Sequence, residues 1–305
     1  MFPYIGGKSH HIKWMDPLFP DNFSTFVEVF GGAGWVSVKS QKVDNSSMRI
    51  YNDFNPLLAN VFECFRQDPS TLLSKMNSIP KSDIPLYKQY QQELFVSLDW
   101  NTVQLGDFDL ALKYLYLQTQ VFAGTPLSAT NVPYFADKNP KYASKYETLK
   151  KKLQNQDIVN RLQKITTVEK VDCVDLIKKY DSEDTFFYVD PPYYNMEFYY
   201  SKDFPKEKHE ELADTLRQIK GKFALSYYDF DDLKLFYPEN QYTWHRQTVY
   251  RSAATRSGKN KNYAQKSKGI EVLIMNYIPT PKLPVIAKEN KKAIYLNPEL
   301  FSIDN

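Results

Sequence analysis

Thr185-Phe186-Phe187-Tyr188-Val189-Asp190-Pro191-Pro192-Tyr193-Tyr194 is the stretch of this 305-residue sequence that decides the fold. Its first five residues are β-branched or aromatic and too few for a helix, which predicts a strand buried on both faces of a sheet. Proline donates no hydrogen bond to a ladder, so the strand should end at Asp190. Open α/β sheets bind ligands at the carboxyl ends of their strands. The stretch therefore predicts a carboxylate, a rigidly held carbonyl and an aromatic face at a ligand-binding edge.

This combination suits methyl transfer to an exocyclic amino group, whose lone pair is delocalised into the ring and is a poor nucleophile. The Asp190 carboxylate and the Pro191 carbonyl can accept both N–H hydrogens and orient the lone pair, while Tyr193 stacks on the ring. The competing interpretation is an ordinary strand end followed by a Pro-Pro turn. The residues resemble the amino-methyltransferases, whose adenine-modifying members carry Asp-Pro-Pro-Tyr. Asp190, Pro191, Pro192 and Tyr193 are accordingly the candidate catalytic residues.

Composition restricts the class of protein. An apolar share of 42% supports a full core, and 23 Tyr and 20 Phe leave aromatic side chains for stacking on bases. A net charge of +3 is only mildly basic, so a nucleic-acid surface requires local clustering of cations. Cys64 and Cys173 suggest reduced thiols of an intracellular protein, and the histidines form no metal-ligand spacing. No apolar run reaches membrane-spanning length, so we expect a soluble protein.

Near the start, Tyr4-Ile5-Gly6-Gly7-Lys8-Ser9 places a double glycine before a cation. Glycines let the backbone approach a ligand closely, although an ordinary N-terminal turn would look the same. The segment resembles the aromatic-x-Gly-Gly-Lys segment of Dam-type DNA adenine methyltransferases, which helps hold S-adenosylmethionine, with Tyr4 where tryptophan is more usual. The resemblance implies cofactor contacts from Tyr4, Ile5, Gly6 and Lys8, and a DNA contact from Lys8.

A second glycine segment follows the first predicted strand, which runs from Phe23 to Phe30. Gly31-Gly32-Ala33-Gly34 predicts a tight turn into a helix from Trp35 to Gln41, where a cofactor can sit against the backbone. A second strand, Met48 to Asn52, ends at Asp53, 19 residues beyond Gly34. This is about the ~20-residue separation at which an acid accepts ribose hydroxyls in dinucleotide folds, so these features alone fit a nicotinamide enzyme equally well.

The pattern Phe30-x-Gly32-x-Gly34 lacks the third glycine of the dinucleotide fingerprint. It resembles the Phe-x-Gly-x-Gly signature of S-adenosylmethionine-dependent methyltransferases. Phe30, Gly32, Gly34 and Asp53 are therefore candidate cofactor-binding residues.

From Asn55 to about Lys164 the pattern becomes helical. The predicted helices are Leu57 to Phe65, Leu86 to Leu98, Leu110 to Phe122 and Tyr146 to Leu162. In the Dam-type family this part of the chain holds a helical target-recognition domain with a hairpin that reads DNA. Asn131-Val132-Pro133-Tyr134 resembles part of that hairpin, which implies DNA contacts from Asn131, Pro133 and Tyr134. A plain connection between two helices is the alternative.

Thr166 to Val171 is another predicted strand, followed by Asp172-Cys173-Val174-Asp175 and a short helix. Position and family resemblance together assign Asp175 as the acceptor for the adenine amino group of the cofactor, together with Asp190 as a further cofactor neighbour. The competing interpretation is that Asp172 or Asp175 is the N-cap of the helix.

The segment from Tyr193 to Tyr200 is aromatic and polar and suits a lid, with Tyr194 as a candidate DNA contact. The predictions that follow are a helix over Lys206 to Ile219, a strand over Lys222 to Tyr227, a short helix over Asp231 to Phe236, and an antiparallel pair formed by Gln241 to Arg251 and Gly269 to Tyr277. Between the last two strands, Ser252 to Lys268 carries five cations and no acid. A solvated loop would explain this composition, but a long loop in a compact domain usually has a function. Binding of DNA phosphates by Arg256, Lys259 and Lys261 would be such a function.

Over nearly the whole chain the motifs resemble a Dam-type DNA adenine-N6 methyltransferase. The implied fold is a Rossmann-like α/β methyltransferase fold, with a seven-stranded, mostly parallel sheet and a reversed terminal β-hairpin. Residues 1–55 and 166–305 would form the catalytic domain and residues 56–165 the helical target-recognition domain. The implied cofactor is S-adenosyl-L-methionine, with S-adenosyl-L-homocysteine as product, and no metal.

The implied partner is double-stranded DNA, from which the target adenine is flipped out. We expect a monomer without membrane contact, in the cytoplasm or on the nucleoid, or in the host cytoplasm if the protein is viral; a restriction endonuclease is a candidate partner. The alternatives are methylation of another planar amino group, in RNA or in a protein glutamine, and a non-catalytic DNA-binding relic.

Overall fold

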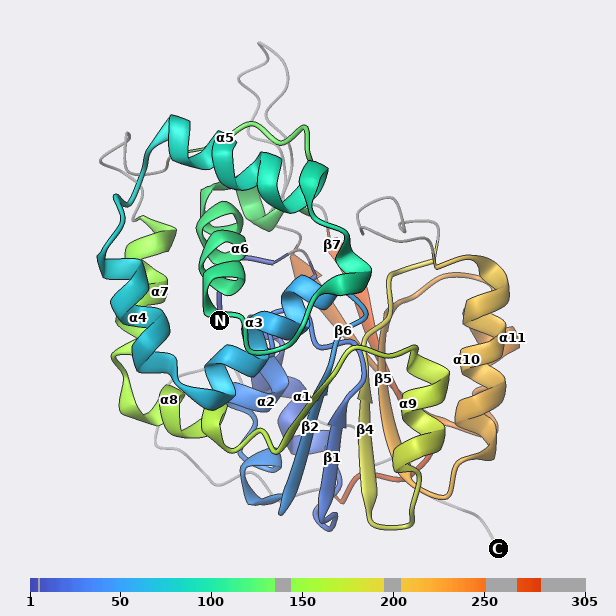
Figure 1. Cartoon of the computed structure of the whole chain (residues 1–305). Coiled ribbons are helices and arrows are strands. Elements are labelled where there is room, and N and C mark those ends of the chain that lie inside the picture. Colours follow the sequence, from blue (N-terminus) through green and yellow to red (C-terminus); the bar gives the residue numbers. More distant parts are fainter. Residues whose placement is uncertain (5, 135–143, 195–203, 251–267, 281–305) are drawn as a thin grey trace, which may run out of the picture.

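The computed structural model describes residues 1–4, 6–134, 144–194, 204–250 and 268–280, and these residues are organised around one seven-stranded sheet (Figure 1). The strand order is β3-β2-β1-β4-β5-β7-β6. The pairs of β1 with β2, β1 with β4, β2 with β3 and β4 with β5 are parallel, whereas β7 is antiparallel to both β5 and β6. The predicted fold class, a mostly parallel sheet with a reversed terminal hairpin, is confirmed. The strands are β1 (Thr25–Glu28), β2 (Met48–Asn52), β3 (Thr167–Glu169), β4 (Thr185–Val189), β5 (Lys222–Tyr228), β6 (Thr243–Tyr250) and β7 (Lys268–Met275).

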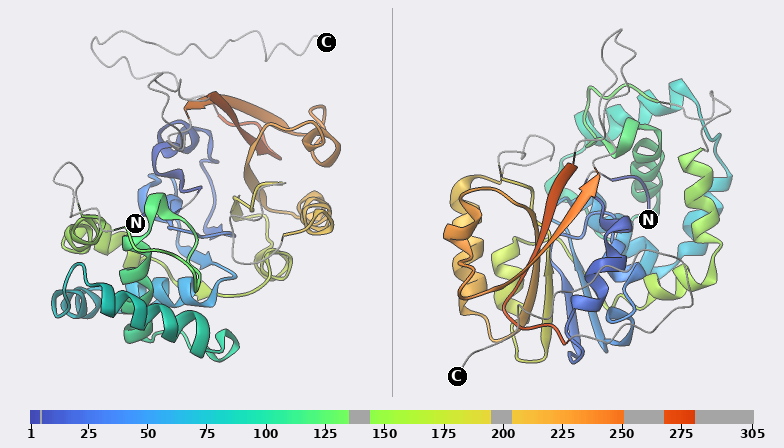
Figure 2. Two further views of the ribbon diagram at one scale, coloured as in Figure 1. Left: turned by 90° about the horizontal axis from the view of Figure 1, so that it is seen from above. Right: turned by 180° about the vertical axis from the view of Figure 1, so that it is seen from behind.

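Strand β4 lies in the middle of the sheet and is buried along its whole length, as its sequence predicted. Successive side chains of a strand point to opposite faces, so Phe186 and Tyr188 pack on one side and Phe187 and Val189 on the other. Helices α1 (Ile12–Met15) and α2 (Trp35–Lys39) cover the first face, and α9 (Cys173–Tyr180) and α10 (Lys206–Gln218) cover the second. Figure 2 shows these two groups on opposite sides of the sheet, with the short α11 (Leu233–Phe236) beside α10.

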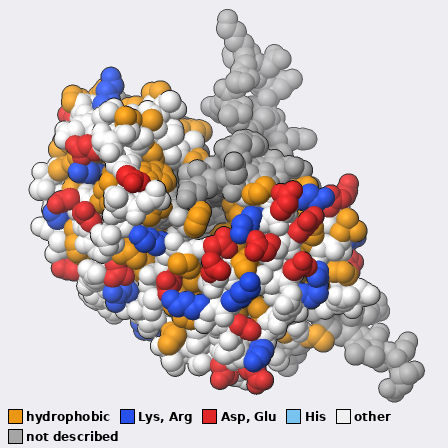
Figure 3. Space-filling model, turned by 45° about the vertical axis from the view of Figure 1, so that its right-hand side comes forward, with side chains coloured by type: hydrophobic (Ala, Val, Ile, Leu, Met, Phe, Trp, Pro, Cys, Tyr) orange, Lys and Arg blue, Asp and Glu red, His pale blue; other side chains and the backbone are white. Residues whose placement is uncertain are grey.

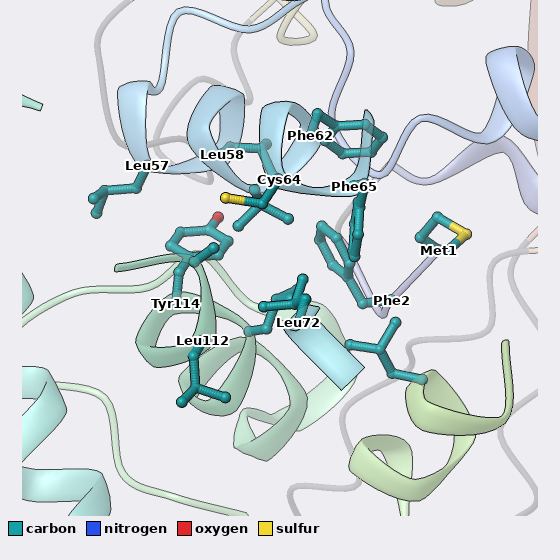
Figure 4. Close-up of a cluster of buried hydrophobic side chains, with 14 of the residues drawn as sticks. Met1, Phe2, Leu57, Leu58, Phe62, Cys64, Phe65, Leu72, Leu112 and Tyr114 are labelled. Carbon is teal, nitrogen blue, oxygen red and sulfur yellow. The ribbon is translucent and has the colours of Figure 1, made fainter. Parts of the chain in front are cut away.

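The chain between β2 and β3 forms a helical module at one end of the sheet (Figure 1). Its hydrophobic core lies between α3 and α6, where the side chain of Cys64 lies beside that of Tyr114 (Figure 4). Met1 and Phe2 enter the same core from the start of the chain. The division at residues 56 and 165 therefore stays a prediction, because flanking residues share the module's core. The helices of the module are α3 (Pro56–Gln67), α4 (Pro69–Asn77), α5 (Ile84–Gln92), α6 (Phe108–Gln120), α7 (Lys145–Leu153) and α8 (Gln156–Gln163).

Two predicted helices of the module differ in the structure. The helix expected from Tyr146 to Leu162 is two helices, because the side chain of Asn155 accepts a hydrogen bond from the backbone N–H of Ile158 at 3.2 Å and starts α8 afresh. The helix expected from Leu86 to Leu98 is α-helical only to Gln92 and continues as a π-helical turn over Glu93–Ser97.

None of the helices within the described ranges is both long enough and apolar enough to span a membrane. On the face shown in Figure 3, cationic and anionic side chains are interspersed over the described surface. This agrees with the small net charge of the sequence.

Candidate active site

A cavity of about 240 Å³ opens where β1, β2 and β4 end, at the carboxyl edge of the sheet. Phe30 follows β1, Asp53 follows β2 and Asp190 follows β4, so the parallel arrangement delivers all three side chains to one place. Of the residues predicted for the site, those that line this cavity are Tyr4, Gly6, Lys8, Phe30, Gly32, Asp53, Asp190 and Pro192.

Asp53 is anchored at the second strand end by two backbone N–H groups. Its Oδ2 accepts from Gly32 at 2.9 Å and its Oδ1 accepts from Asn55 at 2.9 Å. Burial raises the pKa of Asp53 to about 6, although these two hydrogen bonds favour the ionised form. A carboxylate has about four lone-pair sites, so each oxygen can accept a further hydrogen bond from a ligand.

The glycine turn is required by close packing and by backbone conformation. Gly34 has φ +62°, and a Cβ on it would lie 2.4 Å from the ring of the fully buried Phe62 of α3. Gly32 has φ +51°, and a Cβ on it would lie 3.2 Å from the ring of Tyr4. Gly32 thus lets Tyr4 approach the cavity, whereas Gly34 packs the turn against α3 and is not part of the cavity lining.

Glu28, which the sequence analysis did not single out, also lines the cavity. It is buried in β1 and accepts hydrogen bonds from the backbone N–H groups of Val36 at 3.3 Å and Ser37 at 3.1 Å. The hydroxyl of Ser37 donates to it as well. Burial raises the pKa of Glu28 to about 7 in spite of these donors. The carboxylate fixes the start of α2 below the cavity.

Asp190 lies where the sequence predicted, at the end of β4, and its closest cation is Lys8. The Lys8 Nζ is 2.8 Å from Asp190 Oδ1, and Lys8 itself is only 4% exposed. Burial raises the pKa of Asp190 to about 6, and Lys8 opposes that rise. Burial acts to lower the pKa of Lys8, but Asp190 and Glu271 hold it above its ordinary value, so Lys8 stays protonated.

The other predicted catalytic residues surround Asp190. Pro191 is buried and Pro192 lines the cavity. The hydroxyl of Tyr193 accepts a hydrogen bond from Lys8 Nζ at 2.7 Å and donates to Glu271 of β7. Its ring packs against Tyr228 at 5.3 Å between centroids. The turn after β4 is therefore tied to the start of the chain and to the terminal hairpin.

Asp175 does not reach the cavity. It lies exposed in the first turn of α9. The residues at the start of this helix that line the cavity are Asp172 and Cys173. Asp172 is the N-cap of α9 and accepts from the backbone N–H of Val174 at 2.9 Å. The helical turn points the side chain of Asp175 outward, so Asp172 rather than Asp175 presents a carboxylate to the cavity.

The predicted DNA contacts in the described part of the chain lie on two surfaces. Tyr194 stacks on Phe230 at 5.2 Å, and its carbonyl accepts from the hydroxyl of Tyr228. In the helical module, the Asn131 carbonyl accepts from Gln91 at 2.9 Å, and Tyr134 contacts Phe122 edge to face. Pro133 is half-buried beside them. The predicted phosphate contacts Arg256, Lys259 and Lys261 lie outside the described ranges, as does the predicted cofactor contact Ile5.

Within the described ranges, no group of three or more His, Cys, Asp or Glu side chains is arranged to hold a metal ion. Cys64 and Cys173 are both buried free thiols.

Comparison with known proteins places this arrangement in a family. A family model described as D12 class N6 adenine-specific DNA methyltransferase matches residues 4–253. Among curated proteins, the chain is 24% identical over 290 residues to the modification methylase StsI of Streptococcus sanguinis, covering 90% of this chain and 42% of that protein. It is 24% identical over 227 residues to the type II methyltransferase M.CviBI of Paramecium bursaria Chlorella virus NC1A, covering 72% of this chain and 78% of that protein. The chain thus spans less than half the length of the first relative. Since the family model covers most of the chain and includes every strand end at the cavity, the chain belongs to the D12 class of N6 adenine-specific DNA methyltransferases.

Proposed function

We propose that this chain transfers a methyl group from S-adenosyl-L-methionine to the N6 amino group of an adenine that is flipped out of double-stranded DNA. One observation carries the proposal: the Asp190 carboxylate, held by Lys8, stands on the wall of the same cavity into which Asp53 and the glycine turn project. Acceptor and cofactor site therefore share one space, as direct transfer between two bound molecules requires.

The side chains of the cavity fit such a cofactor. Asp53 has free acceptor capacity on both oxygens for ribose hydroxyls, and Asp172 offers a carboxylate for an adenine amino group. Phe30, Phe54 and Phe204 supply apolar surface for a ring. When bound, S-adenosyl-L-methionine supplies an electrophilic methyl group.

The chain's own task is to orient the amine. The ionised Asp190 and the carbonyl of Pro191 are the acceptors we assign to the two hydrogens of the target amino group, which directs the nitrogen lone pair away from the ring. With a pKa of about 6, Asp190 is mostly ionised at neutral pH and accepts rather than donates. The same carboxylate is the base we assign to the proton that leaves the nitrogen after transfer.

Exposed apolar side chains on the helical module support a DNA-facing role for that module. Phe122 is 58% exposed, Val132 81% and Tyr134 39%. Large apolar side chains that remain exposed together are typical of a surface that binds a partner, and aromatic ones stack on bases. Asn131, Pro133 and Tyr134 are the contacts we assign there, and Lys8 and Tyr194 those at the catalytic end.

Two measurements test the proposal. The purified chain is assayed for methylation of DNA, and DNA from cells that express the chain is analysed by long-read modification sequencing. We expect N6-methyladenine at one short sequence, and we expect Asp190→Ala to abolish it while the melting temperature stays near wild type. Lys8 keeps Glu271 as a counter-ion at 3.2 Å when Asp190 is removed, which is why folding should survive. Activity of Asp190→Ala within tenfold of wild type would contradict the assignment.

The same assay separates the alternatives. Methylation of RNA or of a protein glutamine in place of DNA would identify another planar amino group as substrate. DNA binding without cofactor binding in calorimetry would identify a non-catalytic relic. The two relatives are a modification methylase and a type II methyltransferase, which supports a modification role for this chain, with a restriction endonuclease of the same target sequence as its functional counterpart.

A further inference from the structure

Glu271 of β7 is a buried carboxylate beside the active site that the mechanism above does not use. It is 6% exposed, and its Oε1 lies 3.2 Å from Lys8 Nζ. The same oxygen accepts from Ser226 Oγ at 3.1 Å and from the hydroxyl of Tyr193. A buried charge is costly unless it is paired, so Glu271 and Lys8 depend on each other.

Lys8 is consequently shared between two carboxylates. Its Nζ contacts Asp190 at 2.8 Å and Glu271 at 3.2 Å, and it also donates to the Gly6 carbonyl at 3.2 Å. Burial acts to raise the pKa of Glu271, but Lys8 and the Tyr193 hydroxyl hold it below its ordinary value, so Glu271 is ionised. One cation between two anions leaves the cluster with a net charge of −1.

The proposed reaction makes this net charge important. The new N–C bond forms as the bond between the methyl carbon and its sulfur breaks, and positive charge moves from the sulfur to the N6 nitrogen. Lys8 alone would neutralise Asp190 and place a second positive charge near that nitrogen, which opposes the transfer. A second carboxylate beside Lys8 removes this opposition.

Building on the proposed function, we infer that Glu271 is a positioning residue that acts as the counter-ion of Lys8, so that the charge of Asp190 remains available to the target amine. Lys8 then orients Asp190 without cancelling it. Tyr193 and Ser226 hold the Glu271 carboxylate in place for this role.

The variant Glu271→Gln tests the inference because it keeps the shape and removes the charge. We expect kcat for DNA methylation to fall by about 10- to 100-fold, the effect of one unit charge a few Å away in a partly buried site. The KM for DNA should stay within about twofold, since the target amine carries no charge in the ground state. A matched control is Glu169→Gln, because Glu169 also accepts from a lysine and a tyrosine, Lys179 and Tyr180, away from the cavity.

The pH profile gives a second measurement, which a purely structural role would not change. Glu271 raises the pKa of Asp190 through its charge, so removing it should lower that pKa and move the acid limb of the kcat profile to lower pH. The other titratable or charged groups that face this pair are Lys8, His11, Glu28, Tyr188 and Tyr193.

The decisive comparison is a double-mutant cycle with Lys8→Met. If Glu271 acts through Lys8, Glu271→Gln lowers kcat in the wild-type background and has no effect or raises kcat in the Lys8→Met background. An equal loss in both backgrounds, or a wild-type kcat and pH profile for Glu271→Gln, overturns this inference alone. A wild-type chain without methyl transfer to any substrate overturns the proposed function and this inference together.

Discussion

Protonation of Asp53 should control cofactor affinity. With its pKa raised to about 6, Asp53 is about nine-tenths ionised at pH 7 and about one-tenth ionised at pH 5. Hydroxyls of a ribose donate to the ionised form, so the charge-assisted interaction is lost as the pH falls through 6. The dissociation constant for S-adenosyl-L-methionine should therefore rise by about tenfold between pH 7 and pH 5.

The variant Asp53→Asn removes the charge and keeps the shape. A hydrogen bond to a charged group contributes about 1.5–3 kcal/mol, so losing the charge should weaken cofactor binding at pH 7 by about ten- to hundredfold. The variant should also bind with little dependence on pH between 5 and 7, because the titrating group is gone. Calorimetric titration of the free enzyme with cofactor over this range measures both effects.

Variants of the two acids near the start of α9 give a control and a comparison. Asp175→Asn should bind cofactor like wild type, since Asp175 is exposed outside the cavity lining, whereas Asp172→Asn should bind more weakly. Two results would refute the role of Asp53. One is that Asp53→Asn binds the cofactor at pH 7 with the same dissociation constant as the wild-type protein. The other is that the cofactor affinity of the wild-type protein does not change between pH 7 and pH 5.

Two further perturbations concern the glycine turn and the basic loop. Gly34→Ala should lower the free energy of unfolding by about 2–5 kcal/mol in urea denaturation, from positive φ and overpacking together. Gly106→Ala should cost only about 1–2 kcal/mol, because it shares the positive φ but meets a flexible glutamine side chain, and equal losses would argue against overpacking. Replacing Arg256, Lys259 and Lys261 together by alanine should weaken binding to all DNA sequences alike and reduce the slope of log affinity against log salt by about 0.9 per contact, with base preference unchanged. An unchanged salt slope would show that the loop does not bind phosphates.

Local sequence patterns were sufficient for the central strand and for the acids at the sheet edge, whereas the whole seven-stranded sheet was implied by the family resemblance. The run from Thr185 to Val189 is β-branched or aromatic at every position, which predicted a strand buried on both faces, and parallel pairing then brought Asp53 and Asp190 to one edge. Lys8 was predicted as a cofactor contact from the resemblance of its segment to the Dam-type family. Its contact with Asp190 at 2.8 Å depends on how the start of the chain folds over the sheet, which no local pattern contains.

Helix boundaries were less predictable. Asp172 and Asp175 are equally good N-cap candidates by residue type, and the choice between them decides which carboxylate faces the cavity. In the structure the bond from Val174 N–H to Asp172 selects the first. Because the helix starts after Asp172 and not three residues later after Asp175, Asp175 lies in its first turn and faces solvent. One capping hydrogen bond is too small an energy to read reliably from sequence.

Glu28 and Glu271 were missed for a different reason, because each was counted within an apolar run that was correctly predicted as a strand. A carboxylate inside a buried strand cannot remain without hydrogen-bond donors. Glu28 obtains them locally, from the backbone of α2 that follows its own strand. Glu271 has no such helix and obtains them from Lys8 and Tyr193, far away in the chain. An acid in the interior of a predicted strand is thus itself a signal that a cation or a helix start packs against that position, and at an active site such a cation is the one to test.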